Sequence, residues 1–411
     1  MTEGKRHPRN LAVVCNTTRC GGVYRAVSTL CNAWSHQGRQ VYLIALYDYE
    51  SFFHLEASVR RIDALTAQAT GGVARIRRKG ENLLGRSLAG LKHFCPQSLA
   101  DHLTVNAGFL RLSPRVRPLR AAIQHTDASV VIAFGWQANV LTLLACRNLG
   151  RKVIISERDD VASRPLEQPW EELRCGLYNC ADVVTANTNA ALRAMQSYVG
   201  RDKLVFVPNP SVRSDSRLST PELPPFTPPI ILIVANLTWR KAHEVLLAAF
   251  ARLSPELSHW RLAIVGGGEE EKTLREHATE LGVAERVDWY GRVADPFVFY
   301  RAAGMFVLPS RSEGMPNALI EAMSYGVPVI VSNASPGPLD LVKDGETGLV
   351  VPVDDPLALA NAITSLGNDG ALRKRLGKAG HQRVAEYDLA NIMSLWDRII
   401  ATGPTTNQER C

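Results

Sequence analysis

The sequence lacks a long uninterrupted apolar run. Its most apolar long window, residues 130 to 146, contains Gly135, Gln137 and Asn139 and falls short of the roughly 20 residues that a membrane-spanning helix needs. No secretory signal is recognisable either, because residues 1 to 9 are polar and basic. These absences argue against a membrane-spanning or secreted protein and predict a cytoplasmic one.

Cysteine patterns typical of metal sites are also missing. The chain has eight cysteines, and no two of them have the C-x-x-C spacing of thiolate metal ligands. The pattern predicts reduced, mostly buried thiols, as expected for a cytoplasmic chain. The cysteines are at positions 15, 20, 31, 95, 146, 175, 180 and 411.

The length and the apolar content predict two domains. The chain has 411 residues, of which 46% are hydrophobic, and single cores usually stop growing at roughly 250 to 300 residues. The first half alternates apolar strand patterns with helix patterns, which is typical of a doubly wound parallel sheet. Strands are predicted at residues 11–16, 41–46, 130–134, 153–156, 183–186 and 204–207, and helices at 23–34, 138–148 and 168–179.

A segment rich in proline and serine separates the two halves. It begins at Pro208-Asn209-Pro210 and ends at Pro229, after which the strand and helix alternation restarts with residues 230–234. Ligands of open α/β sheets bind at the carboxyl edge of the strands, so two such sheets predict a site in a cleft between them. The predicted divisions are an N-terminal domain over 1–212, a linker over 213–229, a C-terminal domain over 230–387 and a final segment over 388–411.

Positive charge is concentrated in one segment. Residues 71–120 contain ten Lys and Arg against two acidic residues, a net charge of +8 in a chain whose total is +7. Leucine and phenylalanine are interleaved with these charges, so the segment is predicted to be a helical insert that contacts an anionic membrane surface or a diphosphate-bearing acceptor. An equally good interpretation of this segment is a set of helices whose basic face is exposed to solvent. No nucleic-acid-binding motif accompanies the charge.

Two carboxylates lie eight positions apart near the C-terminus, at Glu313 and Glu321. An apolar strand pattern at residues 305–308 precedes them, Pro316 suits a first helical turn, and Gly326 suits a helix end. Backbone N–H groups at the start of this helix would attract phosphate, whereas carboxylates are good acceptors for sugar hydroxyls. Two solvated side chains on a capped helix are the alternative interpretation. The segment in question is residues 314 to 317, in which Gly314, Met315 and Asn317 carry N–H groups and Pro316 carries none.

This block resembles the Glu-x7-Glu signature of family 4 glycosyltransferases, which are retaining enzymes of the GT-B fold. The resemblance implies that Glu313 contacts the hydroxyls of the donor sugar and that Glu321 holds the ribose. Flanking segments at 289–292, 336–338 and 345–352 also look like the family. The fold it implies is two Rossmann-like domains that face a central cleft, with the final helix crossing back to the N-terminal domain.

A basic residue follows the first strand of the second half. Family members usually carry G-R-L there and a lysine five positions after the arginine, and both basic residues bind the donor diphosphate. Lys241 matches that lysine, whereas Ala235 and Asn236 replace the glycine and the arginine. Lys241 must then supply most of the positive charge that a departing nucleoside diphosphate needs, with neighbouring Arg240 as a further candidate.

Gly21 and Gly22 follow the first strand and open a helix, where backbone can approach an anionic ligand. The resemblance implies that this pair lies against the donor, and a plain tight turn is the alternative. Position 25 is arginine, so the G-x-G-x-x-G fingerprint of a dehydrogenase is absent.

Other charged residues have open roles. Many family members have a histidine where this chain reads Ile155-Ser156-Glu157-Arg158. A subgroup that extends polyprenyl-diphosphate-linked sugars carries Ser-Glu-Arg there, so Glu157 and Arg158 either face the cleft or are ordinary loop charges. Arg292 is a candidate neighbour of the nucleobase. The glycines at 266–268 predict a strand-to-helix turn with a structural role.

The resemblance therefore implies a retaining glycosyltransferase with Glu313 and Lys241 at its catalytic centre. It would transfer a hexose or N-acetylhexosamine from a nucleoside-diphosphate sugar, with UDP favoured over GDP, to a hydroxyl of a lipid-linked or envelope glycan. No cofactor, metal or nucleic acid is expected. An inactive nucleotide-sugar-binding protein is the alternative, because the usual arginine and histidine are missing.

Overall fold

The computed structural model describes residues 10–47, 50–64, 112–161, 165–211 and 229–401. The chain forms two compact units: the first contains residues 1–208 and 393–411, and the second contains residues 209–392. Most of the predicted basic insert and all but the last residue of the predicted linker lie outside the described residues.

The first unit is built on a parallel sheet with the strand order β3-β2-β1-β4-β5-β6-β7. Every neighbouring pair is parallel, so the connections must cross over the faces of the sheet. The strands are β1 (Asn10–Cys15), β2 (Gln40–Ala45), β3 (Val59–Asp63), β4 (Val130–Phe134), β5 (Lys152–Glu157), β6 (Val183–Ala186) and β7 (Leu204–Phe206).

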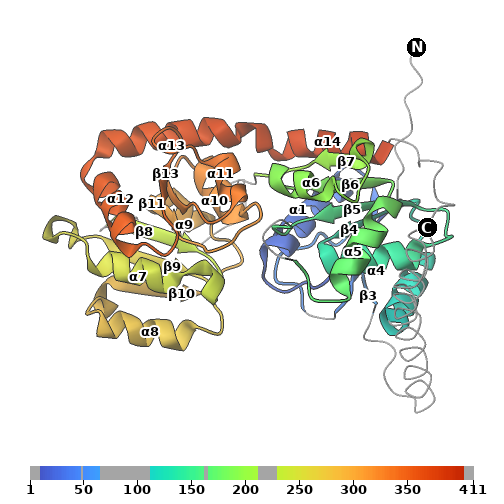
Figure 1. Ribbon diagram of the computed structural model, residues 1–411, viewed down its shortest axis with the longest axis horizontal. Helices are drawn as coiled ribbons and strands as arrows, with labels where there is room; N and C mark the ends of the chain where they lie inside the picture. Colours follow the sequence, from blue (N-terminus) through green and yellow to red (C-terminus); the bar gives the residue numbers. More distant parts are fainter. Residues whose placement is uncertain (1–9, 48–49, 65–111, 162–164, 212–228, 402–411) are drawn as a thin grey trace. The chain divides into compact units, whose positions relative to one another are not determined.

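Helices cover both faces of this sheet (Figure 1). The most apolar of these helices is α4, in which every residue from Ala138 to Cys146 is buried. A helix that is apolar on all sides must be buried on all sides, which places it inside the core. The labelled helices of this unit are α1 (Gly22–His36), α4 (Trp136–Cys146), α5 (Trp170–Leu177) and α6 (Asn189–Met195).

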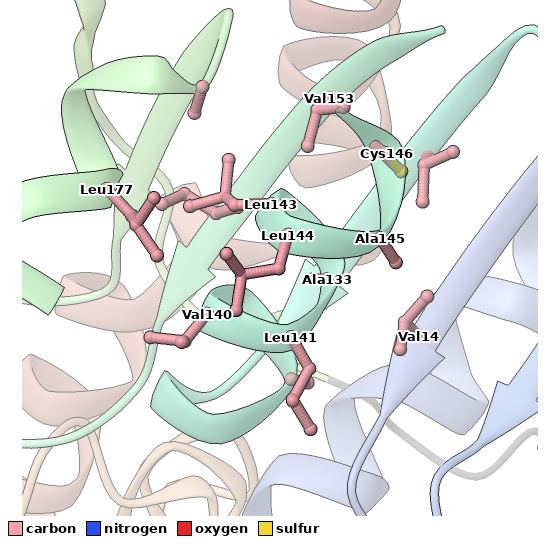
Figure 2. Packing of buried hydrophobic residues seen from close by; sticks show 14 of the residues in the cluster. Val14, Ala133, Val140, Leu141, Leu143, Leu144, Ala145, Cys146, Val153 and Leu177 are labelled. Carbon is pink, nitrogen blue, oxygen red and sulfur yellow. The ribbon is translucent and has the colours of Figure 1, made fainter. Parts of the chain in front are cut away.

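The core of the first unit forms between α4 and one face of the sheet. Figure 2 shows Leu141, Leu144 and their neighbours on α4 packed against Val14, Ala133 and Val153 from the strands. Successive side chains of a strand point to opposite faces, and Ala12 and Val14 accordingly join this cluster while Leu11 and Val13 are buried outside it. Burial on both faces explains why these strands read as continuous apolar runs.

The second unit repeats the same plan. Its parallel sheet has the strand order β10-β9-β8-β11-β12-β13. Leu246 and Phe250 from α7 and Leu359 and Ile363 from α12 belong to its core cluster. The strands are β8 (Ile230–Val234), β9 (Arg261–Val265), β10 (Val287–Gly291), β11 (Ala303–Leu308), β12 (Val329–Ser332) and β13 (Leu349–Val351). The helices are α7 (His243–Ala251), α8 (Glu271–Glu280), α9 (Phe297–Ala302), α10 (Asn317–Ser324), α11 (Pro336–Leu341), α12 (Pro356–Asn368) and α13 (Gly370–Val384).

Each sheet has a point at which the strand order reverses. In the first unit it lies between β1 and β4, and in the second between β8 and β11. Ligands of open α/β sheets bind at the carboxyl ends of the strands beside this switch point. The predicted class of two doubly wound parallel sheets is confirmed, and the topology directs attention to the loops that follow these four strands.

The last helix, α14 (Leu389–Ala401), packs through its second half on the first unit. Trp396 meets Trp34 edge to face, with the ring centroids 5.7 Å apart, and lies against Phe134 at the same distance. Arg39 Nη2 donates to Asp397 Oδ1 at 2.7 Å, and Lys152 Nζ donates to the carbonyl oxygen of Ile399 at 2.5 Å. An aromatic cluster and two charged hydrogen bonds therefore attach this helix to the first sheet.

Among the residues that the structure describes, one cysteine departs from the sequence prediction. Cys15, Cys20, Cys31, Cys146 and Cys175 are free thiols, as predicted, and burial raises the pKa of both Cys15 and Cys146 to about 12. Cys180 is disulfide-bonded, so the expectation of reduced thiols is wrong for this residue. The spacing of the cysteines in the sequence gave no sign of this bond.

Among the residues described, none of the helices combines the length and the apolar character that crossing a membrane requires.

Candidate active site

The loops after β8 and β11 meet at the switch point of the second sheet. The two strands are parallel neighbours, so both loops leave the same edge of the sheet. The loop after β8 carries Lys241 at the end of a short 3-10 turn, Trp239–Lys241. The loop after β11 carries Glu313 and continues into α10. Topology thus brings together two residues that are 72 positions apart.

Lys241 and Glu313 form an ion pair, in which the Lys241 ammonium group donates to Glu313 Oε1. Both side chains are largely removed from solvent, with 13% and 7% of their surface exposed. A second donor, Ser310 Oγ, reaches the same carboxylate oxygen at 2.7 Å. The backbone N–H of Glu313 donates to Ser335 Oγ at 2.9 Å, so both the main chain and the carboxylate of Glu313 are held in place.

The turn that carries Lys241 has an unusual backbone. Ala242 follows with φ 52° and ψ 45°, the left-handed region that a residue with a side chain seldom adopts. This residue caps α7, which begins at His243. His243 is fully buried, and burial together with the nearby Lys241 charge lowers the pKa of its imidazole to about 3. Lys241 is therefore followed by a residue with a strained backbone and by a buried, neutral histidine.

Glu321 lies on α10, eight residues after Glu313, and is 6% exposed. The hydroxyl of Tyr300, from α9, donates to Glu321 Oε2 at 3.0 Å. Pro316 is the residue that precedes α10 and not part of its first turn, because its ψ of 118° is extended. The buried Met315 offers its carbonyl oxygen to Asn209 Nδ2 at 2.9 Å.

Close backbone approach explains one glycine beside this loop. A Cβ atom on Gly337 would lie 1.7 Å from the carbonyl oxygen of Gly314. No side chain fits there, so only glycine lets the start of α11 pack against the loop that carries Glu313.

The glycine turn at residues 266–268 has a structural role, in agreement with the sequence interpretation. A Cβ on Gly266 or Gly268 would lie 1.8 Å or 2.1 Å from the carbonyl oxygens of Ala235 and Leu237, in the loop that leads to Lys241. Arg292 is exposed and donates from Nη2 to the carbonyl oxygen of Gly267 at 3.3 Å. Its side chain therefore lies against this turn.

In the first unit, Gly21 caps the N-terminus of α1 and Gly22 is the first residue of that helix. Both follow β1, at the switch point of the first sheet. The backbone of Gly21 is extended, with φ 171°, and a Cβ atom there would meet nothing within 4 Å. The space beside Gly21 is therefore open, in contrast to that beside Gly337.

Glu157 is the last residue of β5, Arg158 follows it, and both are buried. Glu157 accepts hydrogen bonds from the backbone N–H groups of Arg158 and Asp159 and from the hydroxyl of Tyr178, the last at 2.7 Å. Burial raises the pKa of Glu157 to about 7, with a further contribution from Asp159. Arg158 lies 5.0 Å over the ring of Phe134, and burial lowers its pKa to about 9. Glu157 thus holds the loop that presents Arg158.

The structure brings some of the predicted site residues into contact and shows further residues that support them. It pairs Lys241 with Glu313, whereas Gly21, Gly22, Glu157 and Arg158 belong to the first unit. Sequence reasoning missed the supporting hydroxyl groups, which are those of Ser310, Ser335 and Tyr300. Ser310 lies inside a segment that resembles the family, and Ser335 lies directly before another. The resemblance could therefore have identified both residues. Among the residues described, no group of three or more His, Cys, Asp or Glu could hold a metal ion.

Comparison with known proteins shows the family of the chain. Residues 20–211 match the family described as Glycosyltransferase Family 4, and residues 217–383 match Glycosyl transferases group 1. The chain is 26% identical to an alpha-1,4-N-acetyl-D-galactosaminyltransferase of Campylobacter jejuni, over 95% of this chain and 98% of the relative. That relative is named for the acceptor GalNAc-alpha-(1->4)-GalNAc-alpha-(1->3)-diNAcBac-PP-undecaprenol.

Two solved structures share the fold. Anabaena HepE, in complex with UDP and glucose, superposes with a TM-score of 0.72 at 17% identity, covering 96% of this chain and 99% of that one. Sucrose-phosphate synthase from Thermosynechococcus elongatus gives the same TM-score at 20% identity, covering 96% and 100%. The two doubly wound units therefore define a GT-B fold. The chain belongs to family 4 of the glycosyltransferases and is a glycosyltransferase that depends on a nucleotide sugar.

Proposed function

We propose that this protein is a retaining glycosyltransferase that moves a hexose or an N-acetylhexosamine from a UDP-sugar to a hydroxyl group of a lipid-linked or envelope glycan. The observation that carries the proposal is the Lys241–Glu313 ion pair at the switch point of the second sheet. The UDP bound in the HepE structure supports the choice of nucleotide. The name of the Campylobacter relative supports a polyprenyl-linked acceptor.

Lys241 is assigned to the donor diphosphate. Its ammonium group has three N–H donors, and Glu313 accepts one of them. The others can reach phosphate oxygens, whose negative charge grows as the glycosidic bond breaks. A cation already fixed in a partly buried site stabilises that charge without reorganisation. The backbone N–H groups of Gly314, Met315 and Asn317, at the start of α10, would add donors to the same phosphates.

The two carboxylates have separate tasks in this proposal. Glu313 holds the ammonium group of Lys241 in position and accepts a hydroxyl of the donor sugar, and Glu321 accepts the hydroxyls of the ribose. Asn236 stands where most family members have arginine. With one cationic anchor fewer, a larger share of the diphosphate stabilisation falls on Lys241, with Arg240 in the same turn as its nearest basic neighbour.

Retention of anomeric configuration is proposed from family membership. No residue is assigned as a covalent nucleophile, and the acceptor hydroxyl would attack from the face that the diphosphate leaves. Glu313 already accepts two hydrogen bonds, from Lys241 and Ser310, which suits an orienting carboxylate better than a nucleophile. The proton coupling of the new anomeric centre, measured by NMR on the product, would distinguish retention from inversion.

The competing proposal is a protein that binds nucleotide sugars without turnover. Two features favour it, namely Asn236 in place of arginine and the lack of a histidine after β5. The intact Lys241–Glu313 pair favours turnover. Calorimetry with a panel of UDP- and GDP-sugars, followed by transfer assays in a membrane extract, separates the two. Tight UDP-sugar binding with no product from any acceptor would support the inactive protein.

Gly21 and Gly22 are proposed to lie against the donor. Replacing Gly21 with alanine should leave stability within about 0.5 kcal/mol, because the backbone is extended and the added Cβ meets no protein atom. A ligand that uses this open space would meet the methyl group, so the dissociation constant for the UDP-sugar should rise at least about tenfold, or roughly 1.4 kcal/mol.

Calorimetry and thermal unfolding measure the two effects of Gly21→Ala separately. Gly176→Ala is the matched control, since a Cβ at Gly176 also meets nothing within 4 Å. Unchanged donor affinity in the Gly21 variant would remove this glycine from the donor site.

A peripheral position at an anionic membrane is proposed for the basic segment, residues 71–120. Vesicles that contain anionic phospholipid should bind the protein in a salt-sensitive manner, since each basic residue near such a surface contributes about 1 kcal/mol. Replacing Arg75, Arg77, Arg78 and Lys79 with glutamine should release most of the bound protein in a sedimentation assay. Unchanged sedimentation of this variant would contradict membrane binding through the segment.

A further inference from the structure

Trp239 is the most exposed large hydrophobic side chain of the residues described, with 65% of its surface accessible. Tryptophan usually buries most of its area, and an exposed aromatic ring next to a binding site commonly contacts a ligand. The other exposed large side chains are aliphatic, namely Leu339, Val353 and Leu357.

The ring of Trp239 is held in place although it is exposed. The guanidinium carbon of Arg311 lies 4.5 Å from the ring centroid, and Arg311 Nη1 donates to the carbonyl oxygen of Trp239 at 2.6 Å. Arg311 is fixed in turn by Glu244, at 2.5 Å from Nη2, and by Asp354, at 2.8 Å from Nε. The Arg311 guanidinium group over one ring face therefore favours this orientation of the indole, and its hydrogen bond to the main chain of Trp239 keeps the two residues together.

This arrangement leaves one ring face for a partner. Two carboxylates neutralise Arg311, so the cluster offers little attraction for a phosphate or another anion. The remaining face of the indole is apolar and carries the negative part of the ring quadrupole. A pyranose ring has a matching surface, because its axial C–H groups form an apolar face with slightly positive hydrogens.

The position of Trp239 relates it to the sugar end of the proposed donor. Trp239 shares its 3-10 turn with Lys241, and Arg311 lies two residues before Glu313. The backbone N–H of Arg311 also donates to the carbonyl oxygen of Arg240 at 2.8 Å, which links the two loops. In the proposed arrangement the ribose lies at Glu321 and the transferred sugar at Glu313. In a nucleotide sugar the nucleobase is attached to the ribose, at the opposite end from the transferred sugar, so the acceptor must approach from the sugar end.

We propose that Trp239, supported by Arg311, is a stacking platform for a sugar ring of the acceptor glycan. The inference rests on the proposed glycosyltransferase function and adds a subsite to it. A platform that contacts the acceptor alone contributes to acceptor affinity and to acceptor choice, whereas donor binding stays independent of it.

The direct test uses the full-length protein labelled with 5-fluorotryptophan and saturated with UDP. The fluorine resonance of Trp239 is assigned by its absence from Trp239→Phe. Titration with para-nitrophenyl glycosides of glucose, galactose, mannose, N-acetylglucosamine and N-acetylgalactosamine should shift this resonance with at least one sugar. If none of the five moves it, the platform is refuted.

Kinetics supply the second test, with the glycoside or lipid-linked glycan that gives the highest turnover. Trp239→Ala should raise the KM for the acceptor at least about tenfold while the dissociation constant of UDP changes less than about twofold, and Trp239→Phe should keep most of the affinity. Leu357→Ala is the matched control, because it removes an apolar side chain that is 61% exposed. A rise in the UDP dissociation constant with unchanged acceptor KM would overturn the proposal in favour of nucleobase stacking.

Failure of the proposed function gives a different result. If the wild-type protein binds no UDP-sugar and transfers no sugar, but the Trp239 resonance still moves with a glycoside, the platform stands as a carbohydrate-binding site and only the glycosyl-transfer proposal falls.

Discussion

Replacing Glu313 with alanine is expected to lower kcat by about 10²- to 10³-fold, the loss typical of removing one preorganised electrostatic group from an active site. The variant removes both the proposed acceptor for the sugar hydroxyl and the group that orients Lys241. Lys241→Ala is expected to lower kcat to a similar extent and also to weaken donor binding, because the diphosphate is negative before and after the bond breaks. Initial rates at several UDP-sugar concentrations measure both parameters.

Stability must be measured on the same variants. Truncating one partner of a buried ion pair leaves the other charge unpaired, at a cost of about 3 to 5 kcal/mol. Glu313→Gln keeps the shape and the acceptor for Ser310, so it should stay folded and still lose most activity. The double variant Lys241→Ala with Glu313→Ala should lose less activity than the two single losses combined, because the residues act as one unit.

Glu346→Ala serves as the control for Glu313, since it removes an exposed carboxylate from the same unit. If Glu313→Ala and Lys241→Ala both kept wild-type turnover, the second-unit site would be assigned to the wrong residues.

Acidification is expected to destabilise the second unit through His243. Burial lowers the pKa of this histidine to about 3 in the folded chain, against an ordinary value of 6.5. Between these values the unfolded chain binds the proton and the folded chain does not, so the free energy of unfolding falls as the pH decreases from 6.5 toward 3. At pH 4 the contribution amounts to about 3 kcal/mol, since each pKa unit corresponds to about 1.4 kcal/mol.

Urea unfolding at pH 7 and at pH 4 measures this effect. His243→Leu removes the titrating group and should reduce the difference between the two pH values by about 3 kcal/mol, whereas His259→Gln, at an exposed position, should leave it unchanged. Hydrogen exchange of the α7 amides locates the change, because the two units need not unfold together. An equal loss of stability on acidification in His243→Leu and the wild type would show that another group is responsible.

The glycosyltransferase family of the chain and its class of fold could be predicted from residues that are near one another in sequence. Strands buried on both faces appear as apolar runs, as in residues 130–134 and 305–308, and glycine and proline mark the turns between them. The Glu-x7-Glu spacing and Lys241 were visible in the same way. Elements with mixed composition were missed. β3 has the adjacent Arg60 and Arg61 between Val59 and Ile62 at the edge of its sheet, which breaks the alternation, and α9 is too short to show a helical period.

The tertiary structure alone decided which of these residues meet. Lys241 and Glu313 are 72 positions apart, and Trp239 and Arg311 are equally far apart in the chain. No local pattern records such a contact, because it follows from β8 and β11 being parallel neighbours at a switch point. The same holds for Ser335 beneath Glu313 and for the burial of Glu157 and His243. Sequence specifies the side chains and the local backbone, while the strand order determines their neighbours and hence their charge state and chemistry.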